Sequence, residues 1–447
     1  MRRLRELAER TPASRERYVD LLRAVAITAV VLGHWLITDI GYDGDRRLTG
    51  HSALKELTSA HPVTWLVQVL PLFFIVGGFS NAASLDSRRR RGGDSVGWLQ
   101  DRSGRLIRPT TMLIVVLASG TVLARLLGAK TDEARMVVWF ASIPLWFLSA
   151  YLLVVLLTPI MYGLHRRFGF AVPLVLVGLV ALGDLAWLLG PSGLGDGNFL
   201  FGWLAIHQMG FAWRDGRLPF RRRVAVPLLL GGLAAALLLT VVGPYPISMI
   251  DVPGERLHNM SPPTLALLSV ATAQLGLVML LRDPAERWLQ RIRPWTAVVA
   301  VNSVILTIFL WHISAAILVI GVLHALHLLP TPPVGTAAWW LWRVPWLIML
   351  TVALAVLVAI FNRSEVRGSR RPAARPRGMP GWLAGALSWR PLSAVLTVGG
   401  FVAVIFGLIG NNLAVKEAHE PVGVPTVALV AFLAGAAVLR LLRSLPE

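Results

Sequence analysis

Twelve apolar runs constrain the fold of this chain more than any other feature of its sequence. A helix rises about 1.5 Å per residue and the hydrocarbon core of a bilayer is about 30 Å thick, so a transmembrane helix needs about 20 apolar residues. The sixth run is short, and the ninth is long enough to tilt or to consist of two pieces. We expect an all-α polytopic membrane bundle of about 12 transmembrane helices. The runs lie near 19–40, 63–85, 109–128, 137–162, 170–190, 199–213, 224–243, 264–281, 295–323, 339–361, 394–412 and 424–441.

Composition agrees with a membrane protein and excludes several kinds of chemistry. Hydrophobic residues make up 55% of the chain and charged residues 15%, and the mean hydropathy is +0.64, well outside the range of soluble domains. The first run follows a basic, polar lead and lacks a small-residue cleavage site, so we expect a retained span rather than a signal peptide. The chain has no Cys, which excludes disulfides, thiolate metal sites and a cysteine acyl intermediate.

The net charge of +19 raises the question of nucleic-acid binding, and the placement of the charges answers it. Counted alternately from the N-terminus, the segments between runs carry 33 Lys and Arg on one side and 7 on the other. This asymmetry predicts cytoplasmic N- and C-termini in the plasma (inner) membrane. The basic residues are spread over every inner loop instead of forming one patch, so we expect membrane lipids and no nucleic acid as partners.

The segment between the tenth and eleventh runs is rich in Arg, Pro and Gly, which is typical of a flexible linker. We therefore divide the chain into a ten-span domain at 1–361, a cytoplasmic linker at 362–393 and a two-span hairpin at 394–447. The hairpin runs contain no buried ionisable group, and we interpret the hairpin as accessory.

Arg23 and His34 lie inside the first run, "DLLRAVAITAVVLGHW". An ionisable side chain in a span costs a few kcal/mol and is a candidate functional residue by default. Eleven residues of helix advance by about 16 Å and place both side chains on one face. Arg23 would then lie near the inner surface and His34 past the midplane. Alternatively, Arg23 snorkels to lipid headgroups and His34 makes a packing hydrogen bond.

Arg105 and Arg108 lie in "DRSGRLIRPTT", just before Pro109 at an expected helix start. At i and i+3 they share one helix face. On spacing alone, ordinary positive-inside charge explains them better. The other interpretation is a clamp for phosphate, because the planar guanidinium can bind phosphate in a bidentate manner.

Other polar residues in the runs receive less weight. His312, with Asn302 earlier on what we expect to be the same helix, is a candidate polar contact in the bundle core. The remaining ones, His207 with Gln208 and Asp184, look isolated and are more often packing residues. His324 and His327 have the spacing of metal ligands but no third ligand nearby, so we expect no metal.

With these residues in place, the chain resembles the membrane-bound acyltransferase-3 family of acyl-CoA dependent O-acyltransferases. "RYVDLLRAVAITAVVLGH" is similar to the family's first span, with its Asp, Arg, ten residues and His at Asp20, Arg23 and His34. "LPLFFIVGGFSNAAS" resembles the family's Phe-Phe-x-x-Ser-Gly-Phe, with Gly78 and Phe79 in place and Gly77 where Ser is usual.

Three later segments extend the resemblance over roughly the first 360 residues. "RLIR" at Arg105–Arg108 matches the family's Arg-x-x-Arg at the start of span three. "LWFLSAYLLVVLLTPIMY" at 145–162 resembles its Trp-Phe-Leu span, and "NSVILTIFLWHI" its late span ending near a His. The Gly77 departure and the terminal hairpin, which replaces a secreted domain of some members, leave the acceptor open.

The resemblance implies transfer of an acyl group, with acetyl expected, from cytoplasmic acyl-CoA to a hydroxyl on an extracytoplasmic or lipid-linked acceptor, commonly a carbohydrate. Arg23, Arg105 and Arg108 would hold the CoA phosphates, and an extended pantetheine arm is comparable in length to the rise from Arg23 to His34. His34, expected neutral in its apolar surroundings, would act as general base or carry the acyl group. The resemblance assigns supporting positions to Asp20, Gly78, Phe79, Asn302 and His312.

Two other classes of protein remain open from the sequence. A secondary transporter or flippase would use Arg23 and His34 to bind an anion or relay protons, and twelve spans with both ends inside suit such a carrier. A scaffold without chemistry is the third class, in which replacing Arg23 or Arg105 would affect stability alone.

Overall fold

The structure is a computed structural model that describes residues 2–12, 15–42, 48–190, 193, 195–369, 380–415 and 420–445. Within these residues, eleven helices are long and apolar enough to cross a membrane. The expected all-α polytopic bundle is thereby confirmed. The chain forms two compact units: unit 1 comprises 1–83, 160–303 and 330–348, and unit 2 comprises 84–159, 304–329 and 349–447. Each unit is described by itself.

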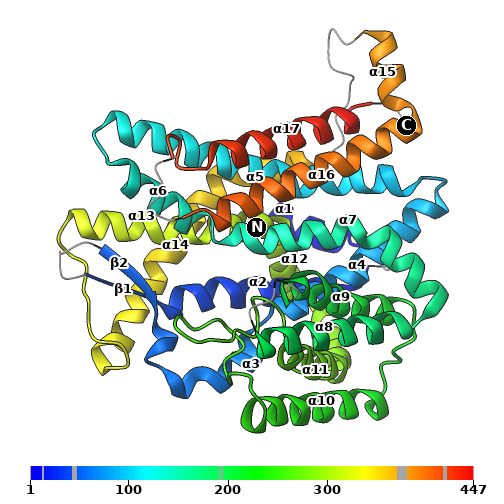
Figure 1. The fold of residues 1–447 in the computed structure, drawn as a ribbon, viewed down its shortest axis with the longest axis horizontal. Helices are drawn as coiled ribbons and strands as arrows, with labels where there is room; N and C mark the ends of the chain where they lie inside the picture. The colour runs from blue at the N-terminus through cyan, green and yellow to red at the C-terminus, as the bar shows by residue number, and fades with distance from the viewer. Residues whose placement is uncertain are drawn as a thin grey trace. The chain divides into compact units, whose positions relative to one another are not determined.

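Unit 1 contains the whole of the first span, the polar segment after it and the helices α8 to α12, which are labelled in Figure 1. Its elements are α1 (Arg2–Glu9), α2 (Arg17–Ile37), β1 (Thr38–Tyr42), β2 (Leu48–Ser52), η1 (Ala53–Lys55), η2 (Thr58–Val63), α3 (Thr64–Val67), α8 (Ala171–Leu189), η3 (Gly195–Gly197), α9 (Asn198–Arg214), α10 (Arg222–Leu237), η4 (Leu238–Val242), α11 (Leu265–Leu289) and α12 (Ile292–Ser303). The two strands form an antiparallel hairpin in which Thr38 pairs with Ser52 and Tyr42 with Leu48.

Within the described residues of unit 2, all the regular elements are helices. Its elements are α5 (Ser95–Leu126), α6 (Thr131–Ala141), α13 (Ile305–Ala325), α15 (Gly381–Ser388), α16 (Arg390–Leu413) and α17 (Thr426–Arg443). Three further helices run from one unit into the other along the chain: α4 (Leu70–Arg90), α7 (Pro144–Phe168) and α14 (Ala337–Ser369).

Each expected apolar run corresponds to helix, and the differences have physical reasons. The sixth run is α9, whose 17 residues are short for a span. The fourth run begins inside α6. The helix is interrupted at Ser142, and α7 starts at Pro144. The ninth run consists of two helices, because Val304 leaves the helical region (φ −134°, ψ 20°) between α12 and α13.

The expected helix start at Pro109 is wrong. Helix α5 begins at Ser95, where the side chain of Asp94 accepts a hydrogen bond from the amide of Gly97 at 2.8 Å, and Pro109 lies in its interior. Arg105 and Arg108 therefore lie within a 32-residue helix, not ahead of one. Such a helix is about 48 Å long, so its length exceeds the hydrocarbon core by several turns.

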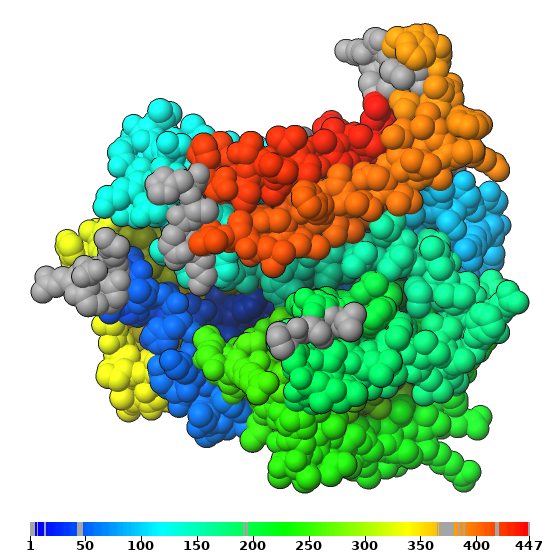
Figure 2. All heavy atoms as spheres, viewed as in Figure 1, coloured from blue at the N-terminus to red at the C-terminus, as the bar shows by residue number. Residues whose placement is uncertain are grey.

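The expected linker at 362–393 is partly helical. Helix α14 continues to Ser369 and α15 occupies Gly381–Ser388, whereas 370–379 lie outside the described residues. The terminal hairpin belongs to unit 2, where α16 and α17 lie side by side and both pack against α5 (Figure 2). The division of the chain at 361 and 393 stays a prediction.

Arg135, a residue of α6, holds the turn between α16 and α17. Its side chain is fully buried and donates to Asn411 Oδ1 at 3.0 Å and to the carbonyl of Gly423 at 2.9 Å. It also donates to the carbonyls of Asn411 and Ala414. Burial lowers the pKa of this guanidinium from its ordinary value, and the surrounding carbonyl oxygens compensate its desolvation. The hairpin is thus held by buried polar contacts as well as by apolar packing.

Candidate functional site

Asp20 and Arg23 form an ion pair in the first turns of α2. Nη1 of Arg23 lies 2.8 Å from Oδ1 of Asp20, a contact that their i and i+3 spacing on one helix favours. Asp20 is buried, and its other oxygen accepts from Nε of Arg15. Nη2 of Arg23 donates to the hydroxyl of Ser80 on α4 at 2.7 Å, and Asn302 donates to the carbonyl of Asp20 at 2.9 Å. This polar cluster therefore joins α2, α4 and α12.

Ser80 is a partner that the sequence reasoning missed, although it directly follows the Gly78-Phe79 motif. Gly78 serves the packing of α4 against α9: a Cβ there would overlap the carbonyl oxygen of His207 and lie 3.1 Å from Cα of Gly210. Phe79 packs against Trp213 of α9 with ring centroids 4.9 Å apart. The close crossing of α4 and α9 thus positions the hydroxyl that Arg23 binds.

His34 lies in the last turn of the same uninterrupted helix and is partly buried. The rise between Arg23 and His34 is therefore the helical one of about 16 Å. The carbonyl of His34 accepts hydrogen bonds from the amide and, at 2.6 Å, from the hydroxyl of Thr38. These bonds end α2 and fix the backbone of its last turn.

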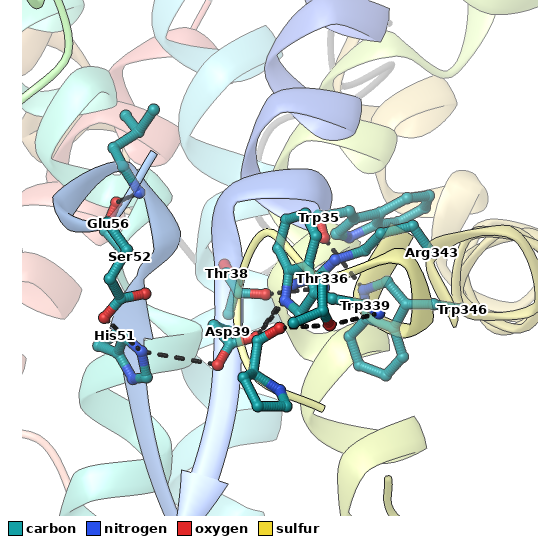
Figure 3. A network of polar contacts seen from close by, with 12 residues as sticks. Trp35, Thr38, Asp39, His51, Ser52, Glu56, Thr336, Trp339, Arg343 and Trp346 are labelled. Atoms are coloured by element: carbon teal, nitrogen blue, oxygen red, sulfur yellow. Dashed lines mark hydrogen bonds and ion pairs between the residues drawn. The ribbon is translucent and has the colours of Figure 1, made fainter. Parts of the chain in front are cut away.

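Side chains of α14 bind the backbone just beyond this turn (Figure 3). Nε1 of Trp346 donates to the carbonyl of Trp35 at 3.0 Å, and Nη1 of Arg343 donates to the carbonyl of Thr38 at 3.0 Å. The last carbonyls of a helix have no partner within it, and in an apolar environment each needs a donor. Helix α14 supplies these donors to the His34 end of α2.

The carboxylate of Asp39 contacts several polar side chains at this end of α2 (Figure 3). Its Oδ1 accepts from Nε1 of Trp339 at 2.7 Å and from Nη2 of Arg343 at 3.1 Å. The Arg343 guanidinium lies over the Trp339 ring, 3.9 Å from its centroid. His51 of β2 lies 3.6 Å from Oδ2 of Asp39, which connects the hairpin to the same carboxylate. We call Asp39, His51, Trp339 and Arg343 the Asp39 network.

Arg105 and Arg108 lie on α5 in unit 2, and both side chains are exposed. One turn earlier, Nη2 of Arg102 donates to the hydroxyl of Ser84 at 2.7 Å, and its guanidinium lies over the ring of Trp98. Spaced three residues apart, Arg102, Arg105 and Arg108 form a basic stripe on the N-terminal half of α5.

His312 is fully buried on α13, where Nδ1 lies 2.6 Å from the carbonyl of Phe309. The expectation that Asn302 precedes it on the same helix is wrong, since Asn302 lies on α12 and belongs to unit 1. Helix α13 starts against Glu365 of α14. The carboxylate of Glu365 accepts from the amides of Leu306 and Thr307 at 3.1 and 2.8 Å, and so caps this helix.

The polar residues that looked isolated in the sequence are hydrogen-bonded in unit 1. Oε1 of Gln208 lies 2.9 Å from Nδ1 of His165, and Nε2 of His207 lies 3.2 Å from Nδ2 of Asn81. The carboxylate of Asp184 accepts from three groups, which are described below. These partners come from helices distant in sequence, so spacing within one run gives no sign of them.

No group of three or more His, Cys, Asp or Glu side chains that could hold a metal ion occurs among the described residues. The absence of a metal stays a prediction.

Comparison with known proteins identifies the family. The family model described as "Acyltransferase domain", that of the acyltransferase-3 family, matches residues 16–362. No curated protein and no solved structure matches the chain. The match contains the whole of α2 with its Asp20–Arg23 cluster and His34, and it ends before the terminal hairpin. The chain therefore belongs to the acyltransferase-3 family of membrane proteins.

Proposed function

We propose that the protein transfers an acyl group, with acetyl the expected one, from acyl-CoA to a hydroxyl of an extracytoplasmic or lipid-linked acceptor, a glycan or glycolipid. The proposal depends on one observation above all. A single unbroken helix, α2, carries a guanidinium near one end and an imidazole in its last turn at the other. The charge asymmetry of the loops supports a cytoplasmic position for the Arg23 end, on the side where acyl-CoA is found.

Arg23 contributes to donor binding through a guanidinium that is already oriented. Asp20 and Ser80 hold Nη1 and Nη2, and the side chain remains 28% exposed, so it is accessible to a phosphate. Charge-assisted hydrogen bonds to phosphate are among the strongest polar contacts in proteins. Arg105 and Arg108 enter the proposal through the family's Arg-x-x-Arg motif and through their exposure on α5.

His34 is proposed to act at the acceptor end. As general base, its imidazole removes the proton of the acceptor hydroxyl while the hydroxyl oxygen attacks the thioester carbon; the carbon–sulfur bond breaks and CoA leaves as the thiol after protonation. As acyl carrier, the imidazole nitrogen attacks the thioester carbon, the carbon–sulfur bond breaks and CoA leaves as the thiol with the imidazole proton. The acceptor hydroxyl then attacks the acyl-imidazole carbon, the carbon–nitrogen bond breaks, and the imidazole takes up the hydroxyl proton. Asp20 lies on the first turns of α2, too far along the helix to orient the ring.

The first test measures release of the CoA thiol from acetyl-CoA by protein in liposomes. The chain contains no Cys, so thiol reagents meet no background from the protein. His34→Ala should lower the rate by about 10²-fold or more, the contribution typical of a general base. His324→Ala, on α13 in unit 2, is the matched control. Normal turnover by a folded His34→Ala variant would remove His34 from the mechanism.

The second test measures binding of acetyl-CoA. Arg23→Ala should weaken it by roughly 10-fold to 100-fold, the value of one or two charged hydrogen bonds. Arg223→Ala, an exposed arginine of unit 1, should leave it unchanged. Solute flux through vesicles without any dependence on acetyl-CoA would instead support a carrier. Radiolabel retained on wild type but not on His34→Gln after incubation with labelled donor alone would establish the acyl-carrier route.

A further inference from the structure

The segment between η4 and α11, residues 243–264, is folded into a fixed structure at one end of unit 1. Nδ2 of Asn259 donates to the carbonyls of Pro246 and Ser248 at 2.7 and 2.9 Å. The hydroxyl of Thr264 donates to Oδ1 of the same Asn259 at 2.8 Å. Asn259 is fully buried, so these bonds form inside the segment and hold its shape.

This segment lies on the same side of unit 1 as the His34 end of α2. The chain leaves α2 through the hairpin and η2, and α3 and the residues after it contact the segment directly. Nε1 of Trp65 donates to the carbonyl of Ile247 at 2.7 Å, and Nε2 of Gln68 donates to the carbonyl of Met249 at 2.9 Å. The amide of Met249 donates to the hydroxyl of Thr64 at 2.8 Å.

A small, open pocket lies between this segment and the end of α8, and its lining is largely apolar with a few polar side chains. Asp184 and Trp187 line it from α8, and Tyr245, Arg256 and His258 from the segment. Trp187 is 37% exposed, and the backbone of Gly195 packs against its ring. The lining of the pocket thus combines a partly exposed indole, a guanidinium and an imidazole.

Asp184 shapes the pocket and is fully occupied by its neighbours. Its Oδ1 accepts from Nδ2 of Asn198 at 2.9 Å; its Oδ2 accepts from the hydroxyl of Tyr245 at 2.8 Å and from the amide of Leu265 at 2.9 Å. The carboxylate therefore fixes the wall of the pocket and leaves binding to other groups.

His258 presents one edge of its ring to the pocket. Its Nδ1 is buried and faces Oδ1 of Asp251 at 3.9 Å, and neither atom has a hydrogen bond within the described residues. The side chain is nevertheless 31% exposed, so the exposed part is the edge that carries Nε2. Burial raises the pKa of Asp251, while Ser261, the amide of Met260 and His258 favour its charged form. The Asp251 carboxylate thus lies behind Nδ1 beyond hydrogen-bonding distance, where its charge can attract the ring, and Nε2 is left for a ligand.

From this arrangement we infer that the pocket binds the hydroxyl-rich, carbohydrate part of the acceptor, with Trp187 against a sugar face and Arg256 and His258 bound to its hydroxyls. An aromatic ring can pack against the apolar C–H face of a pyranose. The guanidinium can donate hydrogen bonds to the sugar hydroxyls, and the imidazole can donate to or accept from them. The inference rests on the proposed function, which has the acceptor arrive from the extracytoplasmic side. It adds to that function the residues that recognise the acceptor.

The experiment is saturation-transfer NMR on the full chain in phospholipid nanodiscs, free of glycoside detergents, with a panel of methyl hexopyranosides as probes. Wild type should transfer saturation to ring protons of at least one probe. Trp187→Ala and His258→Ala should each weaken binding of that probe by roughly 3-fold to 10-fold. Trp187→Phe, which keeps an aromatic face, should retain most of the binding.

Trp288→Ala, at an exposed tryptophan of α11 in the same unit, is the matched control and should bind like wild type. Absence of transfer from every probe to wild type would overturn the inference, as would binding that Trp187→Ala and His258→Ala leave unchanged in variants with wild-type melting temperatures. Acetyl-CoA binding by the same preparations separates the two proposals. If it persists, only the acceptor pocket has failed; if Arg23→Ala leaves it unchanged, the proposed donor site has failed.

Discussion

The ion pair between Asp39 and Arg343 should be strongly coupled, and a double-mutant cycle measures that coupling. The side chains are 14% and 7% exposed, and 3.1 Å separates Oδ1 of Asp39 from Nη2 of Arg343. Asp39→Asn keeps an acceptor for Nε1 of Trp339, which donates to the carboxylate at 2.7 Å, but removes the charge that balances the guanidinium. Arg343→Met removes the guanidinium and keeps the apolar stem.

The magnitude follows from what each single variant leaves behind. Leaving one partner of a buried ion pair uncompensated costs about 3 to 5 kcal/mol, whereas replacing both often costs little. Arg343→Met also removes the donor to the carbonyl of Thr38, which adds about 1 to 3 kcal/mol that the double variant does not recover. Taken in full, these costs would give a larger coupling than is measured for residues in contact, about 0.5 to 3 kcal/mol, because the surroundings relax in each single variant. We therefore expect the two single effects to exceed the double effect by about 2 kcal/mol or more.

The assay is unfolding of the purified protein by titration with a denaturing detergent, followed by tryptophan fluorescence. Thr38 also donates to the carbonyl of His34, so both single variants should disturb the last turn of α2. Under the proposed function, acyl transfer should then fall through kcat, while the KM for acetyl-CoA, set at the other end of the helix, stays near the wild-type value. Single effects that add to the double effect within about 0.5 kcal/mol would show that the pair is not coupled and refute the reasoning.

Three further predictions concern residues that stabilise helix packing, a helix start and the hairpin turn. Gly78→Ala should destabilise the protein by about 1 to 3 kcal/mol because its Cβ meets the backbone of α9, whereas Gly178→Ala, with no atom within 4 Å, should be neutral or stabilising; equal melting temperatures for the two variants would contradict this. Burial raises the pKa of Glu365, so the folded protein holds this proton more tightly than the unfolded chain. Protonation of Glu365 therefore stabilises the protein at low pH, and this stabilisation is lost as pH rises through the folded pKa. The melting temperature of wild type minus that of Glu365→Gln should fall over that pH range. A constant difference would contradict this. Arg135→Lys should lower the melting temperature by several degrees, because an ammonium cannot reach the set of carbonyls that the guanidinium binds in the hairpin turn; an unchanged melting temperature would show that these bonds are dispensable.

The spans could be predicted from the sequence because lipid imposes a local rule. Each helix must satisfy its own backbone and present an apolar length that matches the bilayer, so both requirements are visible within one run. The errors occurred where another rule applied. The sequence predicts a helix start at Pro109, yet a proline is tolerated inside a transmembrane helix where neighbouring groups satisfy the freed carbonyl. Valine is not a residue type that predicts a helix break, so nothing at Val304 indicates that Asn302 and His312 lie on two different helices.

The candidate site was predictable only in part, for a related reason. The ion pair of Asp20 with Arg23 is of the kind that spacing within one helix can predict, since the two residues are three positions apart. The contacts of Arg23 with Ser80 and of Asp39 with Arg343 join residues 57 and 304 positions apart. Such contacts depend on how helices pack, which the local pattern does not specify. Arg343 is a charged residue in an apolar run, the one signal that could have drawn attention to it.

The two ends of α2 are held in different ways, and together they restrain the helix along its axis. At the Arg23 end, side chains of α2 bind a hydroxyl of α4, and Asn302 of α12 binds the carbonyl of Asp20. At the His34 end, tryptophan and arginine side chains of α14 bind the carbonyls of Trp35 and Thr38. A shift of α2 by even one residue would break buried polar contacts at both ends at once, each worth about 1 to 3 kcal/mol. The separation of about 16 Å between Arg23 and His34 is therefore a rigid property of unit 1. Under the proposed function, this helix rather than a mobile loop sets the reach that the donor requires.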